Sequence, residues 1–359
     1  MTNQQKQKLD HLHDLLQKAL ELELFTIPPY LTALYSIKDG VKGRNVDSAK
    51  TILSVVLEEM LHATLVANVM NAVGAKPLVS PGMSDGKLEK CYYPSSMPHI
   101  KKDIKVSLSK FSENAVRDFR TIEEPEKPEE WQESIKSGEI HSIGHLYQIV
   151  LGHLISLAND MGEKELFVGR PDRQVGPEIY QVGPEKYFAA HGGVIRIKGL
   201  ADAMAAISEV SQQGEGRVHV TNLTGDESLF HQSKEVAHFY RFEQILAGRY
   251  YDRDDDLTLS PSGPRLVVDW SAVYNIRPVR DADSSSPDGL DHLLMAFETT
   301  YSELMQVIHQ GFNGEPEVLT KATEIMKKIS YDTVALMQVE VGNGETCGPP
   351  FWFAKARAR

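Results

Sequence analysis

Hydrophobic residues recur every three to four positions over long parts of the chain, which is the spacing of an amphipathic helix. The first such segment spans residues 6–38. The same period predicts further helices at 47–73, 141–160, 199–213, 227–247, 290–311 and 315–341. We therefore expect a mainly α fold.

Two stretches interrupt this helical pattern. Residues 76–138 are rich in proline, glycine, serine and charge, and are expected to form a long surface excursion, as lids and crossovers often do. Residues 251–289 are rich in aspartate and proline. We predict a helical bundle at 1–250 with an insertion at 76–138, a linker at 251–289, and a C-terminal helical pair within 290–359 that packs on the bundle.

Two of the predicted helices carry the motif Glu-x-x-His, as Glu59 with His62 and as Glu235 with His238. An i, i+3 step places both side chains of each motif on nearly the same helical face. A carboxylate and an imidazole on one face form half of a dinuclear iron or manganese site, and each half needs one more Glu from a neighbouring helix. One such motif is usually a solvated helix face, whereas two favour a metal site.

The additional Glu of the first half has one clear candidate, whereas that of the second half has two. Glu23 lies in an apolar run, where a carboxylate is costly unless it is paired or metal-bound. It lies about 15 residues before the first interhelical loop and Glu59 about 12 after it, so an antiparallel hairpin places them at similar height. For the second half, Glu209 and Glu215 both qualify. Six residues separate them, so a regular helix cannot present both on one face.

Other polar residues lie near these motifs. His145, in the helix at 141–160, is expected to be a core or surface histidine, with a position at the site as the alternative. Tyr30 and Arg241 are candidate catalytic residues, Tyr30 as a redox-active group and Arg241 as a partner of an anionic substrate or of a ligand carboxylate. Such tyrosines are more often core residues with one hydrogen bond. Glu58 points about 100° away from Glu59 and is expected behind the ligands or at the surface.

Composition narrows the function further. Thirteen histidines against two cysteines favour nitrogen and oxygen ligation of a metal. The net charge of −12 argues against nucleic acid and anionic membranes as partners. No uncharged apolar run reaches the roughly 18 residues of a membrane span, and the N-terminus lacks the apolar core of a signal peptide. We expect a cytoplasmic protein with a small-molecule substrate, and a homodimer is compatible with the sequence.

Several runs carry a resemblance to a known family. They are Glu-Leu-Glu-Leu-Phe-Thr-Ile-Pro-Pro-Tyr at 21–30, Glu-Glu-Met-Leu-His at 58–62, Ser-Ile-Gly-His-Leu-Tyr at 142–147, Gln-Gly-Glu-Gly at 213–216, His-Phe-Tyr-Arg-Phe at 238–242 and Gly-Pro-Pro-Phe at 348–351. Together they resemble the ferritin-like domain named after iminophenyl-pyruvate dimer synthase, found in violacein and rebeccamycin pathway enzymes. The resemblance spans roughly residues 10–353. It implies a ferritin-like four-helix bundle, a role in secondary metabolism, and Glu215 as the fourth carboxylate.

The resulting hypothesis is a non-haem dinuclear iron oxidase or oxygenase that uses O₂ on a small, amino-acid-derived metabolite. Two iron ions, with manganese as the alternative, would be held by Glu23, Glu59, His62, Glu215, Glu235 and His238. The resemblance also implies an imine-coupling enzyme in which a metal is structural or absent. A third hypothesis is a bundle that binds iron without catalysis, although storage proteins seldom need a long proline-rich excursion or an added helical pair.

Overall fold

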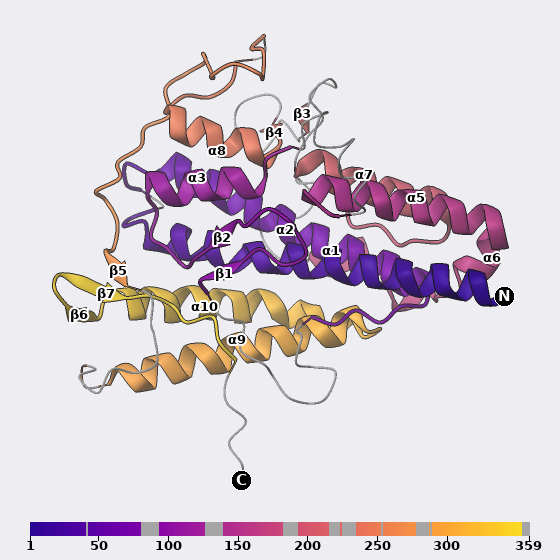
Figure 1. Ribbon diagram of the computed structural model, residues 1–359. Helices are drawn as coiled ribbons and strands as arrows, with labels where there is room; N and C mark the ends of the chain where they lie inside the picture. Colours follow the sequence, from indigo (N-terminus) through magenta and orange to yellow (C-terminus); the bar gives the residue numbers. More distant parts are fainter. Residues whose placement is uncertain are drawn as a thin grey trace.

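Two long antiparallel helices, α1 (Asn3–Ser36) and α2 (Val46–Ala72), form the centre of the fold (Figure 1). They belong to a computed structural model that describes residues 1–40, 42–79, 93–125, 139–181, 193–214, 223–224, 235–252, 254–277, 287 and 289–353. Helices dominate the described chain, so the mainly α prediction is confirmed.

Four shorter helices lie on one side of this pair and, taken end to end two by two, supply the third and fourth rods of a four-helix bundle. They are α3 (Glu113–Ile122), α5 (Ile143–Met161), α7 (Leu200–Gln213) and α8 (His238–Ala247). Helix α5 packs on α1 and α7, α7 packs on α2, and α3 packs on α8. Figure 1 shows α3 and α5 following one another along the bundle, with α8 and α7 doing the same. The backbone N–H of His238 donates to the carbonyl of Gly214 at 3.1 Å, so α8 starts where α7 ends.

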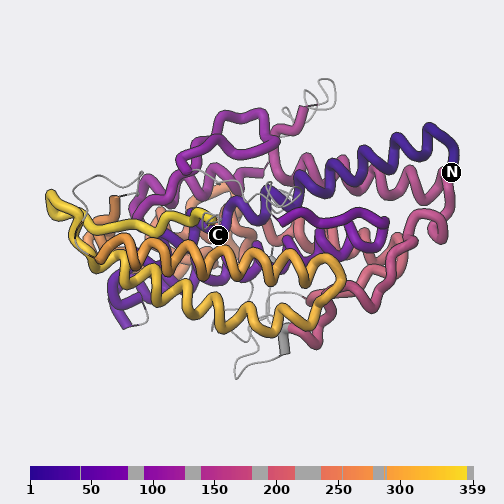
Figure 2. The backbone as a smooth tube through the Cα atoms, turned by 90° about the horizontal axis from the view of Figure 1, so that it is seen from below, coloured from indigo at the N-terminus to yellow at the C-terminus, as the bar shows by residue number. Residues whose placement is uncertain are grey.

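The C-terminal helices α9 (Leu290–Phe312) and α10 (Ala322–Met337) lie on the other side of α1 and α2. They run side by side across the molecule in Figure 2. Helix α2 is long and apolar enough to cross a membrane by length and composition, but 83% of its apolar window is buried inside the protein. Coverage by helices on both sides accounts for that composition.

Short strands and turns connect the helices. The strands are β1 (Ser95–Ser96) with β2 (Lys105–Val106), β3 (Leu223–Thr224) with β4 (Glu235–Val236), and β5 (Ile276–Arg277), β7 (Glu345–Cys347) and β6 (Glu340–Gly342), in which β5 and β7 are parallel. Single helical turns occur at α6 (Glu163–Leu166), η1 (Pro171–Arg173), η2 (Pro177–Gln181) and η3 (Pro316–Lys321). The segment predicted as a linker lies against the α1–α2 turn, where Asn45 exchanges two hydrogen bonds with the backbone of Asp269.

The predicted surface excursion is the main difference from expectation. Its described part contains β1, β2 and α3, and residues such as Phe111, Val116 and Phe119 are buried. Helix α3 begins at a cap, since the hydroxyl of Ser112 accepts the N–H of Ala115. The description of residues 105–125 as surface loop is therefore wrong, because a short apolar stripe folds this stretch onto the bundle.

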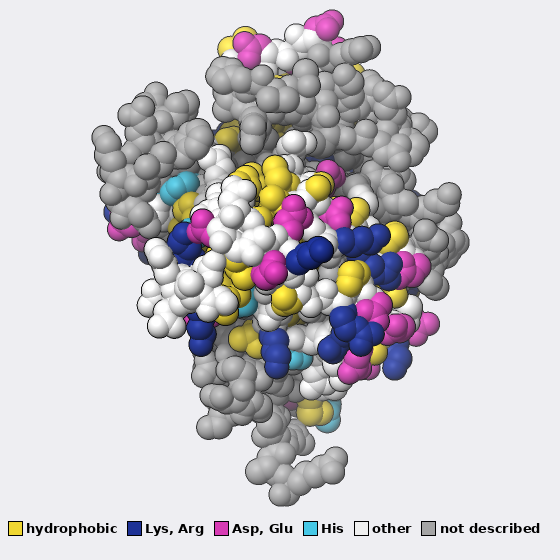
Figure 3. All heavy atoms as spheres, turned by 90° about the vertical axis from the view of Figure 1, so that its right-hand side faces the viewer, with side chains coloured by type: hydrophobic (Ala, Val, Ile, Leu, Met, Phe, Trp, Pro, Cys, Tyr) yellow, Lys and Arg dark blue, Asp and Glu magenta, His cyan; other side chains and the backbone are white. Residues whose placement is uncertain are grey.

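The end of the molecule where α1 begins carries charges of both signs (Figure 3). Lys8 pairs there with Asp160, and Lys18 pairs with Asp14 at 2.7 Å. The described part of this face therefore presents mixed charge rather than a field of one sign.

Candidate metal centre

Five buried side chains converge where the shorter helices meet. Glu23, Glu59 and His62 form one cluster, and Glu59, Glu123 and His238 form a second. Within each cluster the candidate ligand atoms lie within 4.8 Å of one another. All five side chains are at most 3% exposed. Because Glu59 belongs to both clusters, its carboxylate can bridge two cations.

The helices explain this convergence. Glu59 and His62 share a face of α2, and Glu23 faces them from α1. Glu123 is the residue directly after α3, and His238 is the first residue of α8. Three members thus come from the long hairpin, and two come from the points where the other helices stop and start.

The second Glu-x-x-His is built differently from the prediction. Glu235 lies in β4, whereas the helix begins at His238, so a single helix over 227–247 is wrong. The reason is that Ala237 has a non-helical backbone and that the N–H of His238 bonds to the carbonyl of Gly214, at the end of α7. Glu235 and His238 therefore do not share a helical face. The side chain of Glu235 lies outside what the structure describes.

The predicted fourth carboxylate, Glu215, stays untested by the described structure. Glu215 lies outside the described residues, and Glu209 belongs to neither cluster. Neither does His145, which is buried near the start of α5. Glu123 takes the fourth position among the described residues. Its signal in the sequence is that it extends the buried stripe of α3, just as Glu23 interrupts an apolar run.

Each imidazole is held at its outer nitrogen by an oxygen acceptor. His62 Nε2 lies 2.9 Å from Gln213 Oε1, and His238 Nε2 lies 2.9 Å from Glu58 Oε2. The two rings stack with their centroids 5.5 Å apart. A proton on each Nε2 leaves Nδ1 as the nitrogen that faces the carboxylates, which is how acceptors hydrogen-bonded to a metal-binding histidine orient its ring.

The inner nitrogens lie close to the ligand carboxylates. His62 Nδ1 is 3.2 Å from Glu23 Oε2, and His238 Nδ1 is 2.9 Å from Glu59 Oε1. His238 Nδ1 is nevertheless buried without a well-directed hydrogen bond. Such a nitrogen suits a cation placed between it and the carboxylates, so the residues present fit a dinuclear metal ion pair.

The pKa values of the clustered side chains are raised, which shows that the cluster favours added positive charge. Burial raises the pKa of Glu59 to about 7, and the carboxylates of Glu123 and Glu23 add to this. Burial lowers the pKa of His238, but interactions with neighbouring carboxylates, Glu123 foremost, outweigh it and raise the pKa well above its usual value. The pKa of His62 is also raised, because its contact with Glu23 outweighs burial. Without a metal, protons therefore take the place of cations here.

Hydroxyl groups hold the three carboxylates from behind. Burial, with the nearby carboxylates, keeps the pKa of Tyr30 and Tyr147 well above the usual value, so both hydroxyl groups remain protonated and can donate. The donors are Thr26 to Glu59 Oε2 at 2.7 Å, Tyr30 to Glu123 Oε1 at 2.6 Å, and Tyr147 to Glu23 Oε1.

Arg241 lies next to Glu58, the carboxylate behind His238. Its guanidinium donates to Glu58 at 3.0 Å, to Ser54 at 3.0 Å and to the carbonyl of Val236 at 2.7 Å. Arg241 therefore pairs with a carboxylate that supports His238 rather than with a ligand. A catalytic role for Tyr30 or Arg241 stays a prediction.

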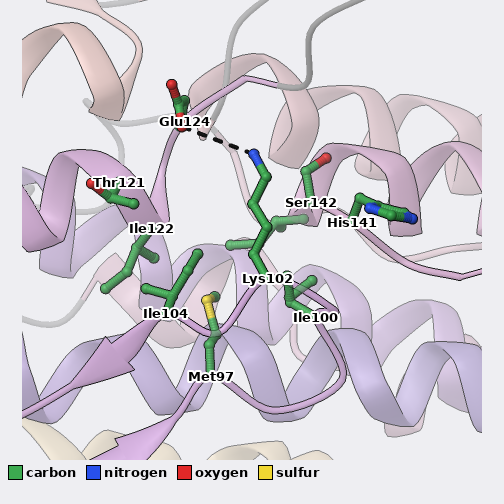
Figure 4. A pocket seen from close by; sticks show the side chains of 10 residues that line it. Met97, Ile100, Lys102, Ile104, Thr121, Ile122, Glu124, His141 and Ser142 are labelled. Atoms are coloured by element: carbon green, nitrogen blue, oxygen red, sulfur yellow. Dashed lines mark ion pairs between the residues drawn. The ribbon is translucent and has the colours of Figure 1, made fainter. Parts of the chain in front are cut away.

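A small hollow is lined by residues on either side of Glu123 in the sequence, Ile122 and Glu124 (Figure 4). Its walls are mainly apolar and include Ile104, Ile122 and Ile143, and its space of about 220 Å³ includes open solvent. Lys102 and Glu124 form an ion pair across it at 3.9 Å.

Comparisons with known proteins agree with this architecture. A family model described as ferritin-like matches residues 16–247. Dichlorochromopyrrolate synthase from Lentzea aerocolonigenes is 24% identical over 349 residues, which cover 87% of this chain and 30% of that protein. The chain thus spans less than a third of that relative's length. The crystal structure of a ferritin-like protein from Caulobacter vibrioides aligns with a TM-score of 0.58 at 21% identity, covering 97% of this chain and 99% of the other.

Proposed function

Since this chain belongs to the ferritin-like family, we propose that its buried cluster holds two metal ions and that the protein is a non-haem dinuclear iron oxidase or oxygenase. The observation that carries the proposal is the shared carboxylate of Glu59, which stands between two imidazole–carboxylate pairs. Iron bound there would supply the redox chemistry that activates O₂.

The protein residues prepare this chemistry. Glu23 and His62 would hold one ion, and Glu123 and His238 would hold the other. Glu59 would contribute to both positions. Nearly complete burial keeps bulk water away from these groups, which strengthens every charge interaction among them. The hydroxyl donors behind the carboxylates fix their orientation before any ion binds.

The proposed substrate is a small, amino-acid-derived carboxylate. Support comes from a relative that is named a synthase, and from the hollow lined by Lys102 and Glu124. Its isoleucine walls suit an apolar side chain, and Lys102 is placed to bind a carboxylate in exchange for Glu124. O₂ would be the second substrate, and the cytoplasm the proposed location.

Anaerobic loading with Fe(II) tests the proposal. Purified protein should bind two irons per chain, and it should consume O₂ when exposed to air. Glu59→Ala and His238→Ala should each lose bound iron, because each removes a central ligand. Glu124→Gln is the matched control, since Glu124 neighbours a ligand but faces the hollow. Protein that binds no iron, or keeps two irons in both alanine variants, would show that this site is wrong.

An imine-coupling enzyme with a structural metal, or with none, is the second candidate. It is favoured by the likeness to a synthase rather than to a protein named as an oxidase. The two candidates differ in their response to chelation. Coupling of an aryl imino acid that persists in chelator-treated protein would favour the second.

A further inference from the structure

The two halves of the cluster differ in what stands behind each imidazole. We name them by that partner: the Gln213 position comprises Glu23, Glu59 and His62, and the Glu58 position comprises Glu59, Glu123 and His238.

The other features are matched between the halves. Each half has one terminal carboxylate held by a buried tyrosine hydroxyl, Tyr147 for Glu23 and Tyr30 for Glu123. Each has one imidazole that is fixed at Nε2 over the same distance of 2.9 Å. Among the described residues, the differences between the positions therefore come mainly from the imidazole partners and from Glu59.

At the Gln213 position the imidazole partner is a neutral amide. Gln213 Oε1 accepts from His62, and Gln213 Nε2 donates to Glu209 Oε1 at 2.7 Å. An amide oxygen is a weaker acceptor than a carboxylate, because charge-assisted hydrogen bonds are about twice as strong. His62 is therefore polarised only weakly.

At the Glu58 position the imidazole partner is a carboxylate. Glu58 accepts from His238 Nε2 and is held by the guanidinium of Arg241, which is always charged. A carboxylate partner increases the basicity of a metal-binding imidazole. Glu59 Oε1 is also closer to this half, at 2.9 Å from His238 Nδ1 against 3.8 Å from His62 Nδ1.

We infer that the two metal positions are unequal, and that the Glu58 position binds its ion first and at least about tenfold more tightly than the Gln213 position. This inference rests on the proposed dinuclear site. Glu58 and Gln213 are the positioning residues that set the difference, and changes to such partners alter metal affinity by about 10- to 100-fold.

Titration of chelator-treated protein with Mn(II), followed by calorimetry and electron paramagnetic resonance, measures this directly. Wild type should bind in two steps, with an isolated Mn(II) signal at half loading and a coupled signal at full loading. Glu23→Gln should remove the weaker step, and Glu123→Gln should remove the tighter one. A single affinity class, or loss of the tighter step in Glu23→Gln, would overturn the inference.

Exchanging the partners tests the cause. Glu58→Gln should weaken the tighter step by about 10- to 100-fold. The double variant Gln213→Glu with Glu209→Gln keeps an amide–carboxylate hydrogen bond but turns the carboxylate toward His62, and should tighten the weaker step by about tenfold. A gain in affinity cannot arise from damage to the fold, so a double variant with no gain contradicts the assigned cause.

Two controls separate this inference from the proposed function. Glu124→Gln should leave both steps unchanged. Mn(II) binding that is absent in wild type, or that survives Glu59→Ala, removes the dinuclear site itself. Two equal steps that both depend on Glu59 would instead leave the site in place and refute only the inequality.

Discussion

The carboxyl group of Glu59 should make the metal-free protein lose stability as pH rises. Its folded pKa is about 7 against an ordinary value of 4.5, because of burial and two neighbouring carboxylates. A raised folded pKa contributes stability that is fully present below about 4.5 and is lost as pH rises through about 7. Between pH ~5.5 and pH ~8 this contribution falls by about 2 kcal/mol.

Urea unfolding of chelator-treated wild type and Glu59→Gln at these two pH values measures the effect. The amide retains an oxygen that can accept from Thr26 but does not titrate, so the pH-dependent loss should be about 2 kcal/mol smaller in the variant. The raised pKa values of His62 and His238 add a loss of the same sign in both proteins. Glu59 is itself one cause of the raised pKa of both histidines, so part of their loss also disappears in the variant and adds to the expected difference.

Metal should reverse the loss at the higher pH. A divalent cation replaces the protons of the cluster, and binding to the folded state alone stabilises it. Added Mn(II) at pH ~8 should therefore stabilise wild type more than Glu59→Gln. Equal pH-dependent losses in wild type and variant would refute the assignment of the raised pKa to Glu59.

Three further outcomes are expected. Glu123→Gln should lower bound metal from two ions per chain to one, measured by elemental analysis against Glu124→Gln, and two ions in both variants would exclude Glu123 as a ligand. Tyr30→Phe leaves a buried carboxylate without its donor, so the free energy of unfolding should drop by about 2 kcal/mol in urea titrations, and an unchanged value would show that the hydrogen bond contributes little. Lys102→Met should raise the KM for a carboxylate substrate about tenfold with kcat nearly unchanged, and a fall in kcat alone would place Lys102 outside substrate binding.

The first hairpin could be predicted from the sequence because its signals are local. Glu59 and His62 share a face by their spacing alone, and the position of Glu23 follows from the length of one antiparallel pair. The structure brings these three side chains together. Glu123 carries a comparable signal, because it follows the buried apolar stripe of α3 that includes Val116, Phe119 and Ile122.

The second half could not be predicted in the same way, because its geometry depends on contacts between distant segments. His238 begins a helix at the end of α7, and this junction is fixed by a hydrogen bond to Gly214, 24 positions earlier. Helical periodicity over 227–247 cannot reveal such a restart. Glu123 reaches the cluster through packing of α3 on α8, another contact between distant parts of the chain.

The packing around α2 also explains how two adjacent carboxylates can both be buried. Side chains of Glu58 and Glu59 leave the helix about 100° apart, so a helix covered on one face would expose one of them. Helices α1, α7, α8 and α9 all contact α2, and both carboxylates are at most 3% exposed. Glu59 can then face the proposed ions while Glu58 supports His238 from behind. Packing on several sides of α2 thus keeps both the proposed ligand carboxylate and its neighbour out of water.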